Sequence, residues 1–316
     1  MFIVTGGAGF IGSNIVAGLN RRGKRNILVV DNLESSEKFL NLRDLQYADY
    51  MDKREFRMKL QNRQFDTQKV SAIFHQGACS DTMEYDGRYM MDNNFTYSKE
   101  LLNFASRRKI PFIYASSAAV YGAESEFLEH PRNEKPLNVY GYSKLLFDQY
   151  VKRQSPKMKQ TVVGLRYFNV YGPREQHKGR MASQAFQLYN QINETGTATL
   201  FEGSGGYGNG DQRRDFVYVE DAVKINLYLA ARKRPLKGVL NVGTGESRSF
   251  NAIARGLGKI MGSVELRYRA MPEGLKEKYQ SFTEADITRL RRIGYTQPFT
   301  SLEDGLAAYV KHLRGA

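Results

Sequence analysis

The residues Phe2-Ile3-Val4-Thr5-Gly6-Gly7-Ala8-Gly9-Phe10-Ile11-Gly12 open the chain with a short apolar run that leads directly into a glycine-rich turn. The apolar run predicts a buried parallel strand, and the apolar spacing that follows predicts a helix from Ser13 to about Arg22. Glycines in such a turn let backbone N–H groups approach a pyrophosphate at the positive N-terminus of the helix. Strand, glycine turn and helix in this order predict a dinucleotide-binding unit.

Strands and helices continue to alternate beyond this unit. Short apolar runs predict strands at residues 27–30, 72–75, 111–115 and 161–168, and a long helix is expected from about Tyr89 to Arg108. The alternation predicts an α/β fold, a doubly wound parallel sheet of the Rossmann-like kind with a second, smaller α/β lobe. We expect residues 1–170 to form the dinucleotide-binding domain, with segments near 213–250 returning to it, and residues 171–316 to form mainly the substrate-binding lobe.

The charge balance bears on possible partners. The chain has 47 Lys and Arg against 33 Asp and Glu, which leaves a net charge of +14. The basic residues are dispersed in short groups such as Arg21-Arg22 and Arg107-Arg108-Lys109, and no nucleic-acid-binding motif accompanies them. A phosphorylated small molecule or a soluble surface explains the charge equally well, so we expect no nucleic-acid partner.

Composition also bears on the compartment and on metals. The sequence has no apolar run long enough to span a membrane and no secretory signal, so we expect a cytoplasmic protein without a membrane partner. Cys79 is the only cysteine, which excludes an internal disulfide and a multi-cysteine zinc site. The four histidines show no metal-ligand spacing, so no metal is expected.

The predicted second strand ends in Asp31-Asn32, about twenty residues past the glycine turn. An acidic residue here typically accepts hydrogen bonds from the adenosine ribose, which favours NAD over NADP. Lys38 and Lys53 follow closely enough to neutralise a 2′-phosphate. These residues alone leave the choice of cofactor open.

The stretch Tyr140-Gly141-Tyr142-Ser143-Lys144 places a phenol and an ammonium four residues apart, so on a helix they share one face. A nearby cation favours the phenolate, which makes Tyr140 a candidate proton acceptor, although such a pair is more often plain packing. Ser117 and Asn169 follow predicted strands. Because the carboxyl ends of parallel strands form the ligand site of such a sheet, we expect these groups to converge there.

Taken together, three of these elements resemble a known family. Thr5-Gly6-x-x-Gly9-x-x-Gly12, Ser117 and Tyr140-x-x-x-Lys144 stand in the order seen in the extended short-chain dehydrogenase/reductase family, which includes nucleotide-sugar epimerases and dehydratases. The resemblance continues through residues 166–173, 214–221 and 241–245, so it covers nearly the whole chain.

Further motifs are similar to the branch of this family that epimerises ADP-linked heptoses at C6 for the inner core of lipopolysaccharide. They include His75-Gln76-Gly77-Ala78-Cys79-Ser80, His177-Lys178-Gly179 and Lys278-Tyr279-Gln280. This resemblance implies an ADP-heptose substrate, one NADP per subunit with NAD as the alternative, and a homo-oligomer, namely a homopentamer.

The motifs and the resemblance together assign site residues. The cofactor-binding residues are Gly6, Gly9, Phe10, Ile11, Gly12, Asp31, Asn32, Lys38, Lys53, Gln76, Gly77, Ala78, Cys79, Ser80, Asn93, Lys144, Val170 and Lys178. The implied substrate-binding residues are Asn169, Arg180, Gln187, Phe201, Glu202, Gly203, Ser204, Arg214 and Tyr279. Arg180 and Gln187 stand where the family has a serine and a histidine, and the loop at 205–212 is longer than in some members, which puts the sugar contacts in doubt.

Inverting a carbon that has no acidic hydrogen requires transient oxidation. Nicotinamide removes hydride from heptose C6, and the resulting ketone takes it back on its other face. Because the two faces are opposite, we expect two proton-transfer groups: Tyr140, supported by Lys144 and Ser117, and Lys178. Arg214 follows a glycine-rich loop and is expected to bind the pyrophosphate, because a guanidinium can contact phosphate oxygens in two places.

Other readings are possible within and outside enzymes. A UDP-hexose 4-epimerase of the same family is the alternative, whereas a 4,6-dehydratase is disfavoured because Ala118-Ala119 follow Ser117 where dehydratases carry an acidic pair. A non-catalytic dinucleotide sensor would need the glycine turn but not Ser117, Tyr140 and Lys144, so their presence favours catalysis.

Overall fold

The computed structural model describes residues 1–34, 36–272 and 279–315. Lys278, the first residue of one motif quoted above, lies outside the described residues. The chain forms two compact units, each described by itself below. The first comprises Met1–Val120, Pro136–Arg166 and Ala222–Leu240, and the second comprises Tyr121–Lys135, Tyr167–Asp221 and Asn241–Ala316.

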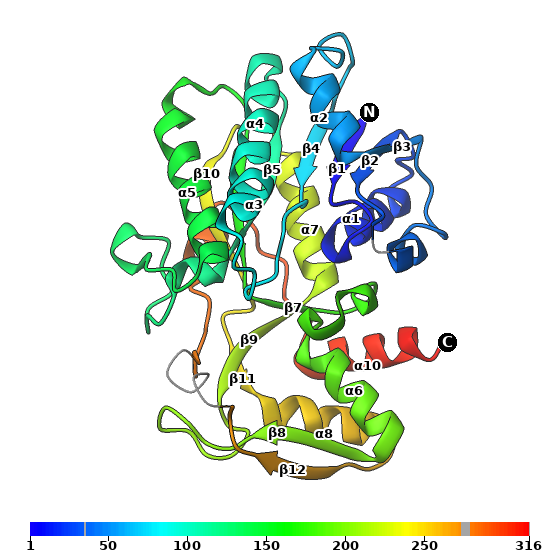
Figure 1. Cartoon of the computed structure of the whole chain (residues 1–316), viewed down its shortest axis with the longest axis vertical. Helices are drawn as coiled ribbons and strands as arrows, with labels where there is room; N and C mark the ends of the chain where they lie inside the picture. Colours follow the sequence, from blue (N-terminus) through cyan, green and yellow to red (C-terminus); the bar gives the residue numbers. More distant parts are fainter. Residues whose placement is uncertain (35, 273–278, 316) are drawn as a thin grey trace. The chain divides into compact units, whose positions relative to one another are not determined.

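The first unit is built on a seven-stranded sheet (Figure 1). Its strands are β1 (Phe2–Thr5), β2 (Ile27–Asp31), β3 (Asp49–Asp52), β4 (Ala72–His75), β5 (Phe112–Ser117), β6 (Val162–Tyr167) and β10 (Lys237–Val242). The strand order is β10-β6-β5-β4-β1-β2-β3, and the central strand β1 pairs in parallel with both β2 and β4. β2, β4 and β6 are buried along their whole length, as expected of strands covered on both faces. The predicted doubly wound parallel sheet is confirmed.

Helices cover both faces of this sheet. They are α1 (Phe10–Arg21), α2 (Lys53–Gln61), α3 (Gly87–Met91), α4 (Tyr97–Arg108), α5 (Val139–Gln154) and α7 (Val219–Ala230). α1 packs on α7 so closely that a Cβ at Gly18 would lie 2.5 Å from Val223 Cγ1. On the other face α2 is tied to α4 by an ion pair of 2.8 Å from Arg57 Nε to Glu100 Oε2, and α4 lies beside α5 (Figure 1).

The long helix expected from Tyr89 to Arg108 is interrupted. It consists of α3, a π-helical turn at Asp92–Thr96 and α4, and it begins where the Asp86 side chain accepts a hydrogen bond from Tyr89 N. A π turn inserts one extra residue into a helix and so redirects the side chains around it. Asn93 and Asn94, both buried, lie in this turn.

The second unit contains two small sheets. β7 (Asn169–Tyr171), β9 (Arg213–Tyr218) and β11 (Ser247–Ser249) form one, and β8 (Thr197–Phe201) pairs in parallel with β12 (Glu265–Arg269) in the other. The helices are α6 (Gln184–Thr195), α8 (Phe250–Met261), α9 (Thr288–Arg292) and α10 (Leu302–Leu313). A core that includes Leu188, Ile253 and Leu306 joins α6, α8 and α10.

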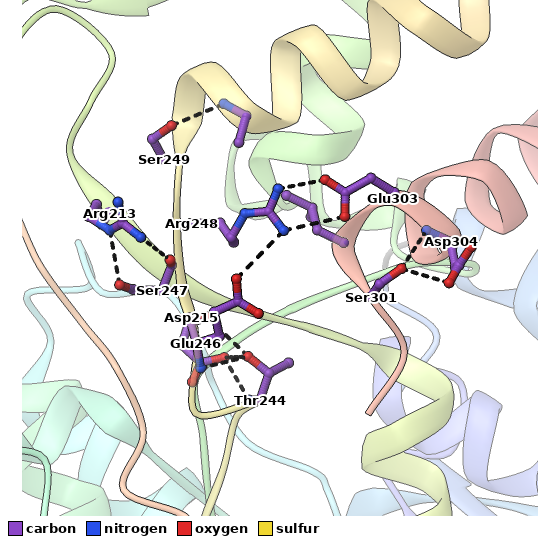
Figure 2. Close-up of polar contacts among 12 residues, drawn as sticks. Arg213, Asp215, Thr244, Glu246, Ser247, Arg248, Ser249, Ser301, Glu303 and Asp304 are labelled. Carbon is purple, nitrogen blue, oxygen red and sulfur yellow. Dashed lines mark hydrogen bonds and ion pairs between the residues drawn. The ribbon is translucent and has the colours of Figure 1, made fainter. Parts of the chain in front are cut away.

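Buried and half-buried charges hold the turns of the second unit together (Figure 2). The Asp215 carboxylate accepts hydrogen bonds from Thr244 N at 2.7 Å, Thr244 Oγ1 at 2.8 Å and Gly245 N at 2.9 Å. Figure 2 also shows Arg248 of β11 beside Glu303 at the start of α10, where the guanidinium lowers the pKa of the carboxyl. The motif at residues 214–221 therefore includes a carboxylate with a structural role.

In the described part of the chain, no helix combines the length and the apolar character that crossing a membrane would require.

Candidate active site

The glycine turn between β1 and α1 leaves no room for side chains. Gly6 has φ +65°, and a Cβ added there would lie 2.6 Å from Gly77 N. A Cβ at Gly12 would lie 2.0 Å from the Gly6 carbonyl oxygen. α1 begins after Gly9, which has no side chain to cap the first N–H groups, and continues through Phe10 and Ile11. This turn fits a dinucleotide, because its close-packed backbone presents a helix N-terminus to an anion.

At the end of β2, both oxygens of the Asp31 carboxylate accept hydrogen bonds. Asp31 Oδ2 accepts a hydrogen bond from Ala8 N at 2.9 Å, and Asp31 Oδ1 accepts one from Lys38 Nζ at 2.7 Å. Lys38 Nζ also donates to the Asn32 carbonyl and side-chain oxygens. Lys53 Nζ donates to Asn93 Oδ1 at 2.8 Å, and burial lowers the pKa of Lys53. Both lysines therefore belong to the same region of the first unit as Asp31.

A buried hydrogen-bond chain connects the glycine turn to the end of β4. Ser98 Oγ donates to the Asn94 carbonyl at 2.6 Å and so must accept from His75 Nε2, which lies 2.7 Å away. His75 Nδ1 is then an acceptor for Thr5 Oγ1 at 2.6 Å. Burial lowers the pKa of His75 to about 3, so the imidazole is neutral. His75 acts here by holding Thr5, the last residue before the turn.

The segment after β4 contains the predicted cofactor residues Gln76, Gly77, Ala78, Cys79 and Ser80. Asn94 fixes it through a reciprocal pair, because its Oδ1 accepts from Cys79 N at 2.8 Å and its Nδ2 donates to Cys79 O at 2.9 Å. Asn94 Nδ2 also lies 3.0 Å from Ser143 Oγ on α5. One buried amide therefore links this segment to the helix that carries Tyr140.

α5 positions Tyr140 and Lys144 as the sequence pattern predicts. The helix begins after Asn138, whose Oδ1 accepts from Gly141 N at 2.8 Å, and Gly141 packs against the backbone of Ala119. Lys144 Nζ is buried, donates to the Ala115 carbonyl at 2.9 Å and lies 5.9 Å from the centre of the Tyr140 ring. Burial lowers the pKa of Lys144 to about 8.

The electrostatics of Tyr140 differ from the simplest expectation. Burial raises the pKa of Tyr140, and the group that counteracts this is the Ser117 hydroxyl through a hydrogen bond, not the Lys144 ammonium. With a pKa of about 8, Lys144 stays mostly protonated at neutral pH, and its Nζ donates to the Ala115 carbonyl rather than to the phenol. The structure therefore brings Tyr140, Ser117 and Lys144 together with Tyr140 in its protonated form.

Asp148 is a buried residue of this site that the sequence reading did not include. It accepts hydrogen bonds from Tyr114 at 3.0 Å, from Ser116 at 2.9 Å and from Arg166 Nη2 at 3.0 Å. Its charge raises the pKa of Lys144 against the effect of burial. The signal was available, because Tyr140, Lys144 and Asp148 follow one another at four-residue intervals on one helix face. His75 and Asn94 had no such signal.

In the second unit, Lys178 lies in a short 3-10 segment at Gln176–Met181. Burial lowers the pKa of Lys178, while the charge of Glu175 acts in the opposite direction. Glu175 is buried and accepts from Gly172 N and from Ser183 N and Oγ. A lysine held in this way can lose its proton more readily than one in water.

The predicted substrate residues of the second unit form two groups. Arg214 is buried, with its guanidinium 5.1 Å from the Tyr279 ring centre and 5.7 Å from that of Phe250, and Phe201 meets Tyr279 edge to face. Gly203 N donates to Asn209 Oδ1, and Gln212 Nε2 donates to the Glu202 carbonyl and to Ser204 Oγ. These contacts link the segment 201–204 to Gln212 and to Tyr279, whose ring lies against Arg214.

The remaining predicted residues lie elsewhere in this unit. Asn169 and Val170 begin β7, where Asn169 is exposed. Arg180 is exposed, and Gln187 Nε2 donates to the Arg180 and Ala182 carbonyls at 3.1 and 2.9 Å. Gln187 therefore holds the backbone next to Lys178.

A glycine turn at a helix N-terminus, beside a strand-end serine and a Tyr-Lys pair on one helix face, defines a dinucleotide-dependent enzyme of the doubly wound class. The model of the NAD dependent epimerase/dehydratase family matches residues 2–243, and the chain belongs to this family. Its cofactor is accordingly a nicotinamide dinucleotide.

Individual relatives extend over the whole chain. The ADP-L-glycero-D-manno-heptose-6-epimerases of Alkalilimnicola ehrlichii and Thiobacillus denitrificans are 54% and 52% identical to it; each match covers 98% of this chain, and 96% and 98% of the relatives. The crystal structure of the Helicobacter pylori enzyme of that name is 33% identical in sequence and has a TM-score of 0.87. The match covers 100% of this chain and 96% of that one. A Thermus thermophilus UDP-glucose 4-epimerase in complex with NAD is 26% identical with a TM-score of 0.81, covering 100% of this chain and 99% of that one.

Proposed function

We propose that this chain interconverts ADP-D-glycero-D-manno-heptose and ADP-L-glycero-D-manno-heptose by transient oxidation at C6, for the heptose of the lipopolysaccharide inner core. The observation that carries this proposal is the 54% identity, over 98% of the chain, to a relative named for that reaction. The Ser117, Tyr140 and Lys144 constellation supplies the acid and base groups that such a reaction needs.

A nicotinamide held by the first unit would supply the redox chemistry, namely removal of hydride from C6 and its return to the opposite face. The protein must move a proton at the C6 oxygen in each direction. Tyr140, whose pKa is raised by burial, holds a proton that it can give as the carbonyl is reduced, and the Ser117 hydroxyl orients it. Lys178, whose pKa is lowered by burial, is the second proton-transfer group.

The first unit holds the dinucleotide in this proposal. The glycine turn and the segment Gln76–Ser80 would bind the dinucleotide, and Val170 and Lys178 are further cofactor contacts in this proposal. NADP is the preferred form in this proposal, because its 2′-phosphate is an anion. Lys38 Nζ lies 2.7 Å from Asp31 and neutralises the carboxylate that would otherwise repel this phosphate. Lys53, which donates to Asn93, supplies a second positive charge. NAD is the alternative.

The second unit binds the sugar nucleotide. Arg214, whose guanidinium lies 5.1 Å from the Tyr279 ring centre and 5.7 Å from that of Phe250, is the anchor for the pyrophosphate, because an anion would offset the burial that lowers its pKa. Asn169, residues 201–204 and Tyr279 contact the substrate in this proposal, as do Arg180 and Gln187. The enzyme works as a homo-oligomer, a homopentamer in this proposal.

The test is to incubate the purified protein with ADP-D-glycero-D-manno-heptose and NADP and to follow the C6 epimer by NMR. Tyr140→Phe should convert the substrate about 10²- to 10⁴-fold more slowly, the usual cost of losing an acid–base group. Tyr142→Phe, two residues away and exposed, is the matched control and should convert normally. No conversion by folded, cofactor-loaded protein would refute the heptose assignment, and conversion of a UDP-hexose at C4 would establish the alternative.

A further inference from the structure

The excess positive charge of the chain resides in six connections of the first unit. Each connection leads from a helix or helical turn to the next strand of the large sheet. Their ranges are 21–26, 42–49, 62–71, 107–111, 152–161 and 231–237. They contain 18 Lys and Arg but only three Asp and no Glu, and the rest of the chain has 29 basic and 30 acidic residues. The net charge of +14 therefore comes from these connections alone.

The fold brings the six connections to one edge of the sheet. Because every helix returns the chain to the start of a parallel strand, the connections precede the amino ends of neighbouring strands. Backbone hydrogen bonds of 2.8 to 2.9 Å join each strand start to its neighbour. The joined pairs are Ala48 with Ile27, Asn26 with Phe2, Met1 with Ser71, Ile73 with Pro111, Phe112 with Thr161 and Val162 with Leu236. At about 4.8 Å per strand, the charged edge is about 29 Å long.

The charged side chains of this amino edge face solvent. Of the 18 basic residues, all except Arg232 and Lys237 are exposed. They occur above both faces of the sheet, since the connections after α1 and α7 lie on one side and those after α2, α4 and α5 on the other. The result is a broad positive surface that extends across all three layers of the unit.

Stabilisation of helix ends accounts for a minority of this charge. Basic residues in the last turn of a helix interact favourably with its partial negative end. Among the 18, Arg21, Arg107, Arg108, Lys152 and Arg153 lie in the last turn of an α-helix, and Lys157 ends the 3-10 helix Ser155–Lys157. The other twelve lie beyond the helices, where the partial negative helix end does not account for them.

In place of the expectation of no membrane partner, we propose that this amino edge binds the surface of a membrane that contains anionic phospholipids. A lipid surface is wide enough to meet the connections on both faces of the sheet at once, whereas a nucleic-acid duplex would meet only one row of them. Single strands are bound by exposed aromatic rings on which bases stack. The six connections, all within the described residues, expose no large apolar side chain. The contact is therefore electrostatic and reversible, without insertion into the bilayer.

This orientation is compatible with the site in the same unit. Ser117 is the last residue of β5, so it lies at the carboxyl edge of the sheet, and the membrane contact involves the opposite edge. Binding to a membrane would leave the Ser117 end of the sheet away from the lipid.

The test uses the full chain and sedimentation with vesicles of phosphatidylcholine, with and without phosphatidylglycerol, at low and high ionic strength. We expect binding only to vesicles with phosphatidylglycerol, and release at high ionic strength. The triple variant Lys24→Glu, Lys157→Glu and Arg234→Glu should reduce partitioning at least tenfold, since each basic residue near an anionic surface contributes about fivefold. The control triple Arg255→Glu, Lys311→Glu and Arg314→Glu, exposed residues of the second unit, changes the net charge equally and should retain most of the binding.

Several results would overturn the proposal. One is that the protein binds no vesicles, or binds vesicles with and without phosphatidylglycerol equally well. Another is that the control triple loses as much binding as the first triple, which would mean that only the net charge matters. If a synthetic duplex or single strand bound more tightly than the vesicles and lost its binding in the first triple, the surface would belong to nucleic acid. Should the glutamate triple fold poorly, Lys24→Gln, Lys157→Gln and Arg234→Gln must show a smaller loss in the same direction.

Discussion

The two edges of the large sheet use the same strands but carry different kinds of residue. At the carboxyl edge, Thr5, Asp31 and His75 are buried and fully engaged in hydrogen bonds at the ends of β1, β2 and β4. At the amino edge, the connections carry exposed Lys and Arg. Helix N-termini face the first edge and helix C-termini the second, so anions are favoured at one and cations at the other. The comparison shows that a chemical site needs side chains fixed by hydrogen bonds, whereas a charged surface needs only that its Lys and Arg side chains lie on the same edge.

The largest expected contrast is between two glycines, one at each edge. Gly12→Ala should lower the free energy of unfolding by about 3 kcal/mol and abolish binding of the nicotinamide dinucleotide, because its Cβ would meet the Gly6 carbonyl oxygen at 2.0 Å. Gly23→Ala, with φ +70° and open space around it, should lower the free energy of unfolding by about 1 kcal/mol and leave dinucleotide binding intact. Denaturant unfolding measures the change in the free energy of unfolding, and cofactor fluorescence measures dinucleotide binding. Equal effects at the two positions would contradict the difference between the edges.

The second prediction concerns the buried ammonium of Lys144. Its pKa is about 8 in the folded protein and 10.5 as the reference for the unfolded chain, so between these values the unfolded state binds more protons. The charged form is penalised by folding below pH 8, and the penalty disappears above pH 10.5. The stability of the wild type relative to Lys144→Met should therefore rise across that window, by up to about 3 kcal/mol.

Unfolding in urea at a series of pH values measures this difference, and titrations common to both proteins cancel. A difference that stays constant from pH 8 to 10.5 would show that Lys144 is not desolvated as its burial indicates.

The third prediction concerns the choice of cofactor at the carboxyl edge. Lys38→Met should weaken NADP binding about tenfold to a hundredfold, the range for losing one hydrogen bond to a charged group, and should weaken NAD binding much less. The freed Asp31 carboxylate would repel a 2′-phosphate but accept a ribose hydroxyl. Lys24→Met at the amino edge is the control and should change neither affinity. Titration with each dinucleotide separates the cases, and parallel losses for NADP and NAD would remove Lys38 from this role.

The smallest effect is expected from the amino edge itself. In solution, without vesicles, the triple variant Lys24→Glu, Lys157→Glu and Arg234→Glu should keep its epimerase turnover. Its free energy of unfolding should differ from that of the wild type by no more than about 0.5 kcal/mol per substituted site. The NMR assay and thermal unfolding check this. A marked loss of turnover without lipid would mean that the two edges are coupled.

Much of the fold was predictable because its signals are local. The glycine turn, the buried strands and the capped helix that carries Tyr140 and Lys144 each depend on about ten consecutive residues, and the structure confirms them as elements. The long helix after β4 was only partly predicted, because apolar periodicity does not reveal the extra residue of the π turn at Asp92–Thr96. The catalytic and binding roles assigned to individual residues stay predictions.

By itself, the sequence determined which residues can form strands, turns and helices and which family motifs they carry, since backbone geometry and side-chain spacing act over short distances. Only the tertiary structure decided which distant residues meet. The hydrogen bonds of Thr5 with His75 and of Asn94 with Cys79 depend on the order of the strands, which the packing of the whole sheet sets. For the same reason, basic residues that look dispersed along the chain gather on a single edge.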